Sequence, residues 1–211
     1  MYQEVSFQSK ASYLTSHKPN GREKEIWVVL HGYGQLAPFF LQKFESIFDE
    51  KRLIIAPEAM NYNYLKGYSG RVGANWMTKH QRELAIENNN QFLNAIIEQV
   101  LEGYRQKPDI HVLGFSQGSA TASRWAAQLN MPIKKLVLWG GGFAHDVDLS
   151  QVNKSLKDTR IIMVWGNKDH FLTEDRLKEQ EEILNKINLK KEKISYKGGH
   201  DIYPAPLKEI L

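Results

Sequence analysis

The chain has 211 residues, of which 42% are hydrophobic and 25% are charged. This balance is typical of a globular protein and excludes a disordered chain, a collagen-like fibre and a coiled coil. At this length we expect residues 1–211 to form a single domain. The formal net charge of +4 is small and the basic residues are scattered, so nothing indicates nucleic-acid binding.

Cysteine is absent from the sequence, which excludes disulfides, a thiolate nucleophile and a cysteine-ligated zinc site. The N-terminal segment up to His17 contains no apolar run of signal-peptide length. The longest apolar runs are strand-sized, far below the roughly 18 residues that a membrane span needs. We therefore expect a cytoplasmic protein with no integral membrane segment.

The first predicted elements alternate between strands and a helix. Polar and apolar residues alternate over 4–16, which predicts one or two edge strands. Residues 26–30 form a continuous apolar run, typical of a strand covered on both faces. Apolar residues recur on one stripe over 36–48, which predicts a helix, and residues 52–56 are the next strand.

A long segment rich in Tyr, Asn and Gly follows over residues 57–77, and we expect it to be a functional or mobile loop. The longest helix is predicted over residues 78–104. The later strands are predicted at 109–115, 135–139, 160–165 and 192–196, and the later helices at 116–129, within 149–157, at 174–187 and, at most one short helix, within 204–211. This alternation predicts an α/β fold with a mostly parallel sheet of about seven or eight strands and helices on both faces.

The sharpest motif is Gly114-Phe115-Ser116-Gln117-Gly118, a G-x-S-x-G pattern between a predicted strand and a predicted helix. A serine on such a tight turn is expected to have a strained, positive-φ backbone, and glycine two residues to either side avoids a collision across the turn. The hydroxyl then lies at a helix N-terminus, where an oxyanion is stabilised. We predict that Ser116 is a nucleophile.

A serine nucleophile needs a base, and the base needs an orienting acid. In this pattern the expected chain order is serine, acid, histidine. Asp169 follows the strand at 160–165 and His200 follows the strand at 192–196, so both come at the carboxyl ends of later strands, where ligands bind in such sheets. The other histidines lack this context, and His170 is adjacent to Asp169. We predict Ser116, Asp169 and His200 as a catalytic triad.

The oxyanion hole is expected to use two backbone N–H groups, one from the residue after the nucleophile and one from the loop after an early strand. These are Gln117 and, in the segment His31-Gly32-Tyr33-Gly34, Tyr33. We expect His31 to hold this loop rather than to act as a base. Gly-Tyr-Gly is not a nucleotide-binding fingerprint, because G-x-G-x-x-G is incomplete.

Together these segments resemble the α/β-hydrolase superfamily, and within it the phospholipase/carboxylesterase group, which includes the acyl-protein thioesterases. The resemblance rests on Leu30-His31-Gly32-Tyr33-Gly34, Gly114-Phe115-Ser116-Gln117-Gly118, Gly166-x-x-Asp169 and Gly199-His200. It implies a serine esterase without a large cap domain, with the triad and oxyanion residues named above.

Two positions depart from the family pattern. Ser119 stands where a second glycine is usual, and Trp76-Met77-Thr78 stands where the family often has Trp-aromatic-Asp. The second departure concerns substrate choice, so we do not transfer thioesterase or phospholipase specificity.

The expected reaction is the hydrolysis of carboxylic esters with small or medium acyl chains, through an acyl-enzyme and without a metal or organic cofactor. The partner is then a small-molecule ester. An apolar acyl pocket is predicted from six side chains: Leu36, Tyr68, Trp76, Met77, Phe143 and Phe171. Alternatives are a thioesterase or lysophospholipase with the same triad, or a non-catalytic binding protein of this fold.

Overall fold

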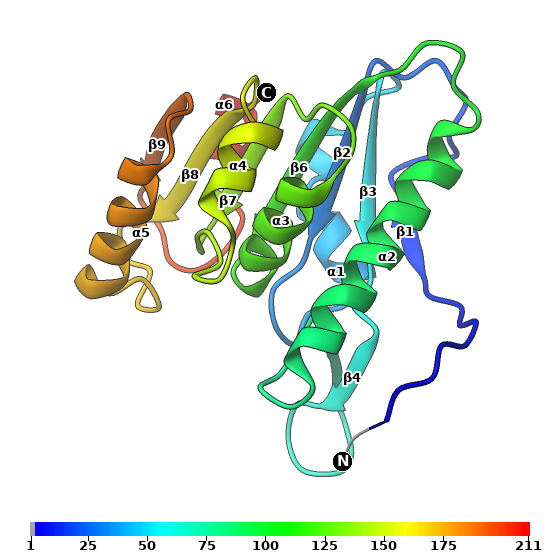
Figure 1. Ribbon diagram of the computed structural model, residues 1–211, viewed down its shortest axis with the longest axis horizontal. Helices are drawn as coiled ribbons and strands as arrows, with labels where there is room; N and C mark the ends of the chain where they lie inside the picture. The colour runs from blue at the N-terminus through cyan, green and yellow to red at the C-terminus, as the bar shows by residue number, and fades with distance from the viewer. Residues whose placement is uncertain (1–2) are drawn as a thin grey trace.

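The central feature of the computed structural model, which describes residues 3–211, is a seven-stranded sheet with the strand order β1-β3-β2-β6-β7-β8-β9 (Figure 1). Every neighbouring pair is parallel except β1 with β3. The strands are β1 (Tyr13–Thr15), β2 (Glu25–Leu30), β3 (Arg52–Pro57), β6 (Asp109–Phe115), β7 (Lys135–Trp139), β8 (Arg160–Gly166) and β9 (Lys191–Tyr196). The carboxyl ends of the parallel strands therefore meet at one edge.

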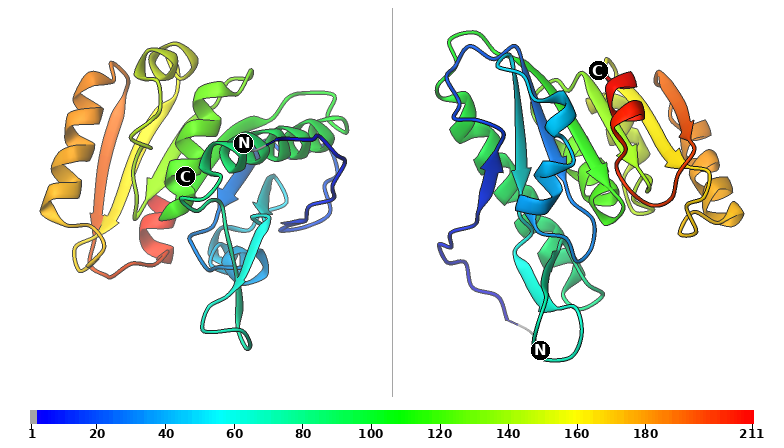
Figure 2. Two further views of the ribbon diagram at one scale, coloured as in Figure 1. Left: turned by 60° about the horizontal axis from the view of Figure 1, so that its bottom comes forward. Right: turned by 180° about the vertical axis from the view of Figure 1, so that it is seen from behind.

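Helices cover both faces of this sheet. Seen from behind, α1 and α6 lie on one face, while α2, α3, α4 and α5 lie on the other (Figure 2). The helices are α1 (Ala37–Gln42), α2 (Arg82–Leu101), α3 (Gln117–Gln128), α4 (Leu149–Ser155), α5 (Glu174–Lys186) and α6 (Pro204–Glu209), with a 3₁₀ turn at Glu45–Ile47. None of the helices in the described part of the chain is both long and apolar enough to cross a membrane.

The alternation of side chains along the strands produces two separate cores. In β2, Ile26 and Val28 pack with α2 and α3, whereas Trp27 and Val29 pack with α1 and α6. All four are at most 1% exposed. A strand buried on both faces carries apolar residues at every position, which explains why the run is continuous rather than alternating.

Three predicted elements differ from the structure at their ends. Only Tyr13–Thr15 of the predicted N-terminal strands is a strand. The helix predicted over 36–48 is broken, because the N–H groups of Lys43 and Phe44 donate to carbonyls three residues back and tighten the end of α1. Helix α2 begins only at Arg82, since Gln81 has a left-handed backbone with φ 48°.

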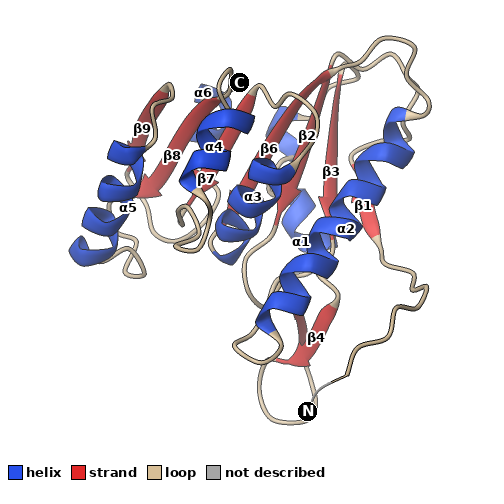
Figure 3. Cartoon of the chain, viewed as in Figure 1, coloured by secondary structure: helices blue, strands red, loops and turns tan. Residues whose placement is uncertain are grey.

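The segment predicted as a loop at 57–77 contains a β-hairpin that projects past the carboxyl ends of the sheet (Figure 3). Its strands, β4 (Asn61–Tyr64) and β5 (Val72–Asn75), pair antiparallel. Gly67 and Gly70 have φ of 59° and 85° in the connecting loop, a conformation that favours glycine. An isolated bridge between Gln35 and Ala74 joins the hairpin to the loop after β2.

Candidate active site

Ser116 occupies the turn between β6 and α3 with φ 54° and ψ −117°, a strained backbone for a residue other than glycine. Glycine is required two residues before and two residues after Ser116. A Cβ on Gly114 would lie 2.3 Å from the Gly118 carbonyl oxygen, and a Cβ on Gly118 would lie 2.2 Å from the Leu30 carbonyl oxygen. The Ser119 hydroxyl donates to the Gly114 carbonyl at 2.7 Å, so the serine at this position helps to close the turn.

The structure joins His200 and Asp169 by a 2.6 Å hydrogen bond between Nδ1 and Oδ2. The Asp169 side chain is fully buried and the His200 side chain is 14% exposed. The Asp169 carboxylate also accepts the Phe171 N–H at 3.0 Å through Oδ1, which fixes its orientation. An Nδ1–H that donates to a carboxylate leaves Nε2 of the imidazole as the free base.

The two loops that carry this pair are packed together. The Lys168 N–H donates to the Gly198 carbonyl, and the Asn167 N–H donates to the Tyr196 carbonyl, both at 2.9 Å. A Cβ on Gly166 would lie 2.3 Å from the Gly198 oxygen, so only glycine permits this approach. The hydrogen bond between His200 and Asp169 therefore spans two loops that are already in close contact.

The His200 ring lies over the end of β6, beside the turn that carries Ser116. Its centroid is 4.8 Å from that of Phe115 and 4.7 Å from that of Phe171. Two glycines after β7 approach His200 and Ser116 closely. A Cβ on Gly140 would be 3.0 Å from His200 Cε1, and one on Gly141 would be 2.6 Å from the Ser116 carbonyl oxygen. Gly140 also has φ 58°, a conformation that favours glycine.

Among residues 3–211, the Ser116 hydroxyl makes no hydrogen bond, to His200 or to any other group. In the absence of substrate such contacts are often longer than in the reacting complex. The nucleophile, base and acid roles therefore remain predictions that the arrangement of the loops supports.

The loop after β2 lies against Ser116. A Cβ on Gly32 would be 3.2 Å from Ser116 Cβ, and Gly34, with φ 72°, donates its N–H to the Ala74 carbonyl at 2.8 Å. Within the described chain, the N–H groups of Tyr33 and Gln117 donate to no other group. Gln117 is also the first residue of α3, where the helix dipole favours negative charge. Both groups are thus available to bind an oxyanion.

The Gln117 side chain has a second role that the motif did not indicate. Its Oε1 accepts the Trp76 N–H at 2.9 Å, and its Nε2 donates to the Met77 carbonyl at 2.8 Å. The Trp76 indole N–H in turn donates to the His31 carbonyl at 2.7 Å. These bonds attach the segment after β5 to the nucleophile turn and to the loop after β2.

His31 is a structural residue, as predicted. It is fully buried, its Nε2 accepts the Ala59 N–H at 3.1 Å, and its Nδ1 donates to the Gly32 carbonyl at 2.7 Å. An Nε2 that accepts a hydrogen bond belongs to a neutral ring, and burial lowers the pKa of His31 in the same direction. Both ring nitrogens are engaged, which leaves none to act as a base.

Two aromatic side chains, Tyr196 and Trp139, make hydrogen bonds to the loop that carries His200. The Tyr196 hydroxyl lies 2.7 Å from the Asp201 carbonyl and 3.1 Å from the Gly199 carbonyl, the two residues that flank His200. The Trp139 indole N–H donates to the Asp201 carbonyl at 2.9 Å. Burial raises the pKa of Tyr196 to about 12, so the hydroxyl keeps its proton. Sequence reasoning missed this support because it depends on contacts of two strands, β7 and β9, with the loop that follows β9.

Three of the six predicted pocket residues, Leu36, Trp76 and Phe143, lie in or against the hydrophobic core between the sheet and α2 and α3. Trp76 and Phe143 are core residues with 0% and 3% exposure, so the pocket prediction is wrong for both. Tyr68 is 98% exposed in the hairpin loop. Leu36 and Met77 are partly buried, Leu36 against the core and Met77 beside the Arg124 guanidinium. Only Phe171, which is 51% exposed, contacts the His200 ring.

A family model described as phospholipase/carboxylesterase matches residues 13–211. The chain belongs to this family. Among curated proteins, none matches the chain. Within residues 3–211, no cluster of three or more His, Cys, Asp or Glu side chains is arranged to hold a metal ion.

Solved structures of the same fold include esterases and an acyl-protein thioesterase. Esterase PE8 has a TM-score of 0.68 and 22% identity, over 96% of this chain and 100% of its own. A phospholipase/carboxylesterase from Dyadobacter fermentans has a TM-score of 0.69 and 22% identity, over 98% and 97%. Acyl-protein thioesterase 2 of Zea mays has a TM-score of 0.71 and 16% identity, over 95% and 96%. At these identities the likeness shows the α/β-hydrolase fold. Family and fold together make this chain an α/β hydrolase of the esterase and thioesterase type.

Proposed function

We propose that this chain, as one catalytic domain over residues 1–211, is a serine hydrolase that cleaves small-molecule carboxylic esters with small or medium acyl chains. Ser116 is the nucleophile, His200 the base and Asp169 the orienting acid. The observation that carries the proposal is the 2.6 Å bond between the His200 and Asp169 side chains, placed beside a serine with a strained backbone.

In the first half of the reaction, Ser116 Oγ attacks the ester carbonyl carbon while His200 Nε2 takes the hydroxyl proton. Asp169 holds the imidazole in the required tautomer and stabilises the imidazolium that forms. The N–H groups of Tyr33 and Gln117 bind the oxyanion of the tetrahedral intermediate, and each lowers the barrier by roughly 3 kcal/mol. The C–O bond to the alcohol breaks, and the alcohol leaves with the proton from His200.

The second half repeats this sequence with water. His200 takes a proton from the water, which attacks the acyl-enzyme carbonyl, and the carboxylic acid is released as Ser116 recovers its proton. The fixed donors of the oxyanion hole act on both intermediates.

The proposal is tested by the hydrolysis of p-nitrophenyl esters with acyl chains of increasing length. Ser116→Ala is expected to lower kcat by roughly 10⁴–10⁶ while its unfolding midpoint stays close to that of the parent. Ser69→Ala, in the exposed hairpin loop, is the matched control and is expected to keep full activity. Full activity in a rigorously purified Ser116→Ala protein would contradict the assignment.

A thioesterase or a lysophospholipase would use the same three residues and would differ from an ester hydrolase only in the leaving group. A panel that compares an oxygen ester, a thioester and a lysophospholipid with one common acyl chain separates them by kcat/KM. Absence of turnover across the panel, together with no acyl-enzyme, would favour the non-catalytic binding protein.

A further inference from the structure

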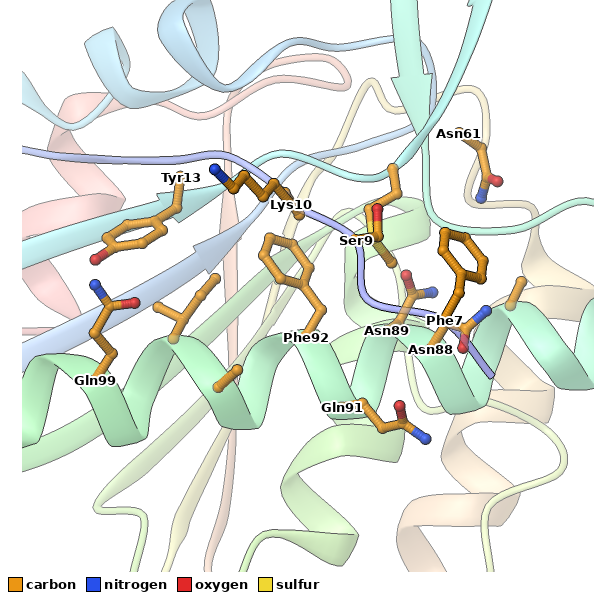
Figure 4. Close-up of a pocket in the computed structure, with 15 residues that line it drawn as sticks. Phe7, Ser9, Lys10, Tyr13, Asn61, Asn88, Asn89, Gln91, Phe92 and Gln99 are labelled. Carbon is orange, nitrogen blue, oxygen red and sulfur yellow. The ribbon is translucent and has the colours of Figure 1, made fainter. Parts of the chain in front are cut away.

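A cavity of about 690 Å³ between the N-terminal segment and helix α2 lies outside the candidate active site (Figure 4). Its lining comes from within residues 7–13, from 60–61 and from within 85–99, and includes none of the three predicted catalytic residues. This cavity therefore offers no group to the reaction at Ser116. The groups that can act on the reaction from outside the triad are those that hold the loops of the site.

His200 lies at the centre of a tight turn, in which the Asp201 N–H donates to the Gly199 carbonyl at 3.0 Å. Tyr196, at the end of β9, and Trp139, at the end of β7, make hydrogen bonds to the carbonyls of this turn. Both contacts act on the main chain. The position of the His200 ring depends on this turn, because the ring belongs to its central residue.

The Asp201 side chain makes a further contact, an ion pair with Lys43. Lys43 Nζ donates to Asp201 Oδ1 at 2.6 Å, and the same oxygen accepts the Ile202 N–H at 2.8 Å. Within residues 3–211, Lys43 is the one donor to residues 199–201 that lies outside β7, β9 and the loop itself. The turn is thus held from the end of α1 as well as from the sheet.

Helix α1 connects Lys43 to the loop that carries Tyr33. Gln35 closes that loop, since its Oε1 accepts the Gly32 N–H at 2.8 Å and its own N–H donates to the Gly32 carbonyl at 3.3 Å. Helix α1 begins at Ala37, and Lys43 is the residue that follows its last turn. The ion pair therefore joins the oxyanion side of the site to the turn that carries the proposed base.

Apolar packing fixes α1 against the ends of the strands. Phe40 is 1% exposed, and its ring centroid lies 6.3 Å from that of His31 and 6.1 Å from that of Phe115, at the end of β6. Ile202, in the loop that carries the base, is 7% exposed and belongs to the same apolar cluster as Phe40. The Lys43 side chain therefore extends from a rigid support.

The exposure of the ion pair indicates what it can contribute. The Lys43 side chain is 28% exposed and the Asp201 side chain is 49% exposed. Pairs of this kind add little to stability, because water screens the charges and both side chains lose conformational freedom. Catalysis is more sensitive, since proton transfer needs the base within hydrogen-bond distance and a small displacement of a catalytic group lowers the rate strongly. We therefore expect an effect on rate without a large effect on folding.

We propose that Lys43 is a positioning residue, which holds Asp201 and thereby fixes the His200 turn relative to the oxyanion loop. This role rests on the proposed function, in which His200 is the base in both halves of the reaction. Acylation and deacylation both slow when the ion pair is lost, so kcat and kcat/KM fall together.

The first test is the hydrolysis of p-nitrophenyl acetate by Lys43→Met, which keeps a long side chain and removes its charge. We expect kcat and kcat/KM to fall together by about three-fold or more, with a urea unfolding midpoint close to that of the parent. Lys43→Arg keeps the charge and is expected to stay within about two-fold of the parent. A smaller loss in Lys43→Met, or an equal loss in Lys43→Arg, would overturn the proposal.

Lys193→Met is the matched control. Lys193 Nζ pairs with Glu181 Oε1 at the same distance of 2.6 Å, and the two side chains are 49% and 55% exposed. This variant loses one charge and one ion pair that makes no contact with residues 199–201, so we expect its kcat to stay within about two-fold of the parent. A loss of kcat equal to that of Lys43→Met would attribute the effect to charge alone, and the proposal would be wrong.

A double-mutant cycle tests whether Lys43 acts through Asp201. Asp201→Asn removes the carboxylate charge and retains an oxygen that can accept the Ile202 N–H. If the two side chains act as a pair, kcat of the double variant with Lys43→Met is expected to lie within about two-fold of the slower single variant. Losses that multiply would show that Lys43 acts by another route, which is the result that contradicts the proposal.

Failure of the proposed function has a different signature. Activity that survives Ser116→Ala would refute the catalytic assignment, whereas an inactive Ser116→Ala beside a fully active Lys43→Met would refute only the role of Lys43. A measurement without turnover is the exchange with water of the His200 Nδ1 proton, followed by NMR and assigned by its loss in His200→Gln. We expect faster exchange in Lys43→Met and an unchanged rate in Lys193→Met, and equal rates in Lys43→Met and the parent would count against the positioning role.

Discussion

His111 is buried in β6 with 4% exposure, and neither of its ring nitrogens has a hydrogen-bond partner among residues 3–211. Its ring stacks on Trp27 at 4.5 Å with an interplanar angle of 14°. Burial lowers its pKa to about 4, and the positive charge of Lys135 acts in the same direction. Glu25 and Asp109 oppose this shift, and Arg52 adds to it. The folded protein therefore holds this imidazole neutral well below the pH at which a free histidine gains its proton.

The consequence for stability follows from the direction of the shift. Above pH 6.5 the ring is neutral in both the folded and the unfolded states, and its titration contributes nothing. Between pH 6.5 and about 4 the unfolded chain binds a proton that the folded chain excludes, so the free energy of unfolding falls as the pH falls. At about 1.4 kcal/mol per pKa unit, the full loss is on the order of 3 kcal/mol.

His111→Phe tests this reasoning, because phenylalanine keeps an aromatic ring against Trp27 but cannot titrate. We expect the free energy of unfolding of the parent, measured by urea denaturation, to fall by about 2–3 kcal/mol relative to this variant between pH 7.5 and pH 4.5. His145→Gln, at an exposed position, is the control and should run parallel to the parent. Parallel curves for the parent and His111→Phe would refute the reasoning.

Three further substitutions probe the site. Tyr196→Phe removes the hydroxyl that holds the His200 loop. We expect the free energy of unfolding, measured by urea denaturation, to fall by about 1–2 kcal/mol, and kcat to fall with little change in KM. An unchanged kcat would contradict the positioning role of Tyr196. Asp169→Asn is expected to lower kcat for p-nitrophenyl acetate by about 10⁴, because the amide favours the wrong tautomer of His200; a change below ten-fold would count against Asp169. Gly118→Ala is expected to lower the free energy of unfolding by several kcal/mol or to prevent folding, because its Cβ would lie 2.2 Å from the Leu30 carbonyl oxygen. A variant that unfolds at the same urea midpoint as the parent would contradict this.

Much of the fold was predictable because its strands are buried on both faces. Residues 109–115 and 135–139 coincide with β6 and β7, since a continuous apolar run of strand length has few other structures open to it. The nucleophile turn was predictable because its G-x-S-x-G pattern lies between a strand and a helix. Gly114 is demanded by a contact within the turn, with the Gly118 carbonyl, whereas Gly118 is demanded by the Leu30 carbonyl of β2.

The parts that were not predictable depend on contacts between distant segments. The hairpin formed by β4 and β5 contains Tyr and Asn rather than an apolar run, and its place is set by the bridge to Gln35. Trp76 and Phe143 were expected in a pocket because aromatic residues on long loops often bind ligands, but the core takes both side chains. The supports from Tyr196 and Trp139 join residues 57 positions apart, and no local pattern marks them.

The central claim, that Ser116 is the nucleophile, is tested most directly by a fluorophosphonate, which reacts preferentially with an activated serine. The adduct is located by mass spectrometry of the intact chain and of its peptides. We expect a single adduct per chain on the peptide that contains Ser116, lost in Ser116→Ala and kept in Ser69→Ala. An adduct on another residue, or none on a folded protein at saturating probe, would contradict the claim.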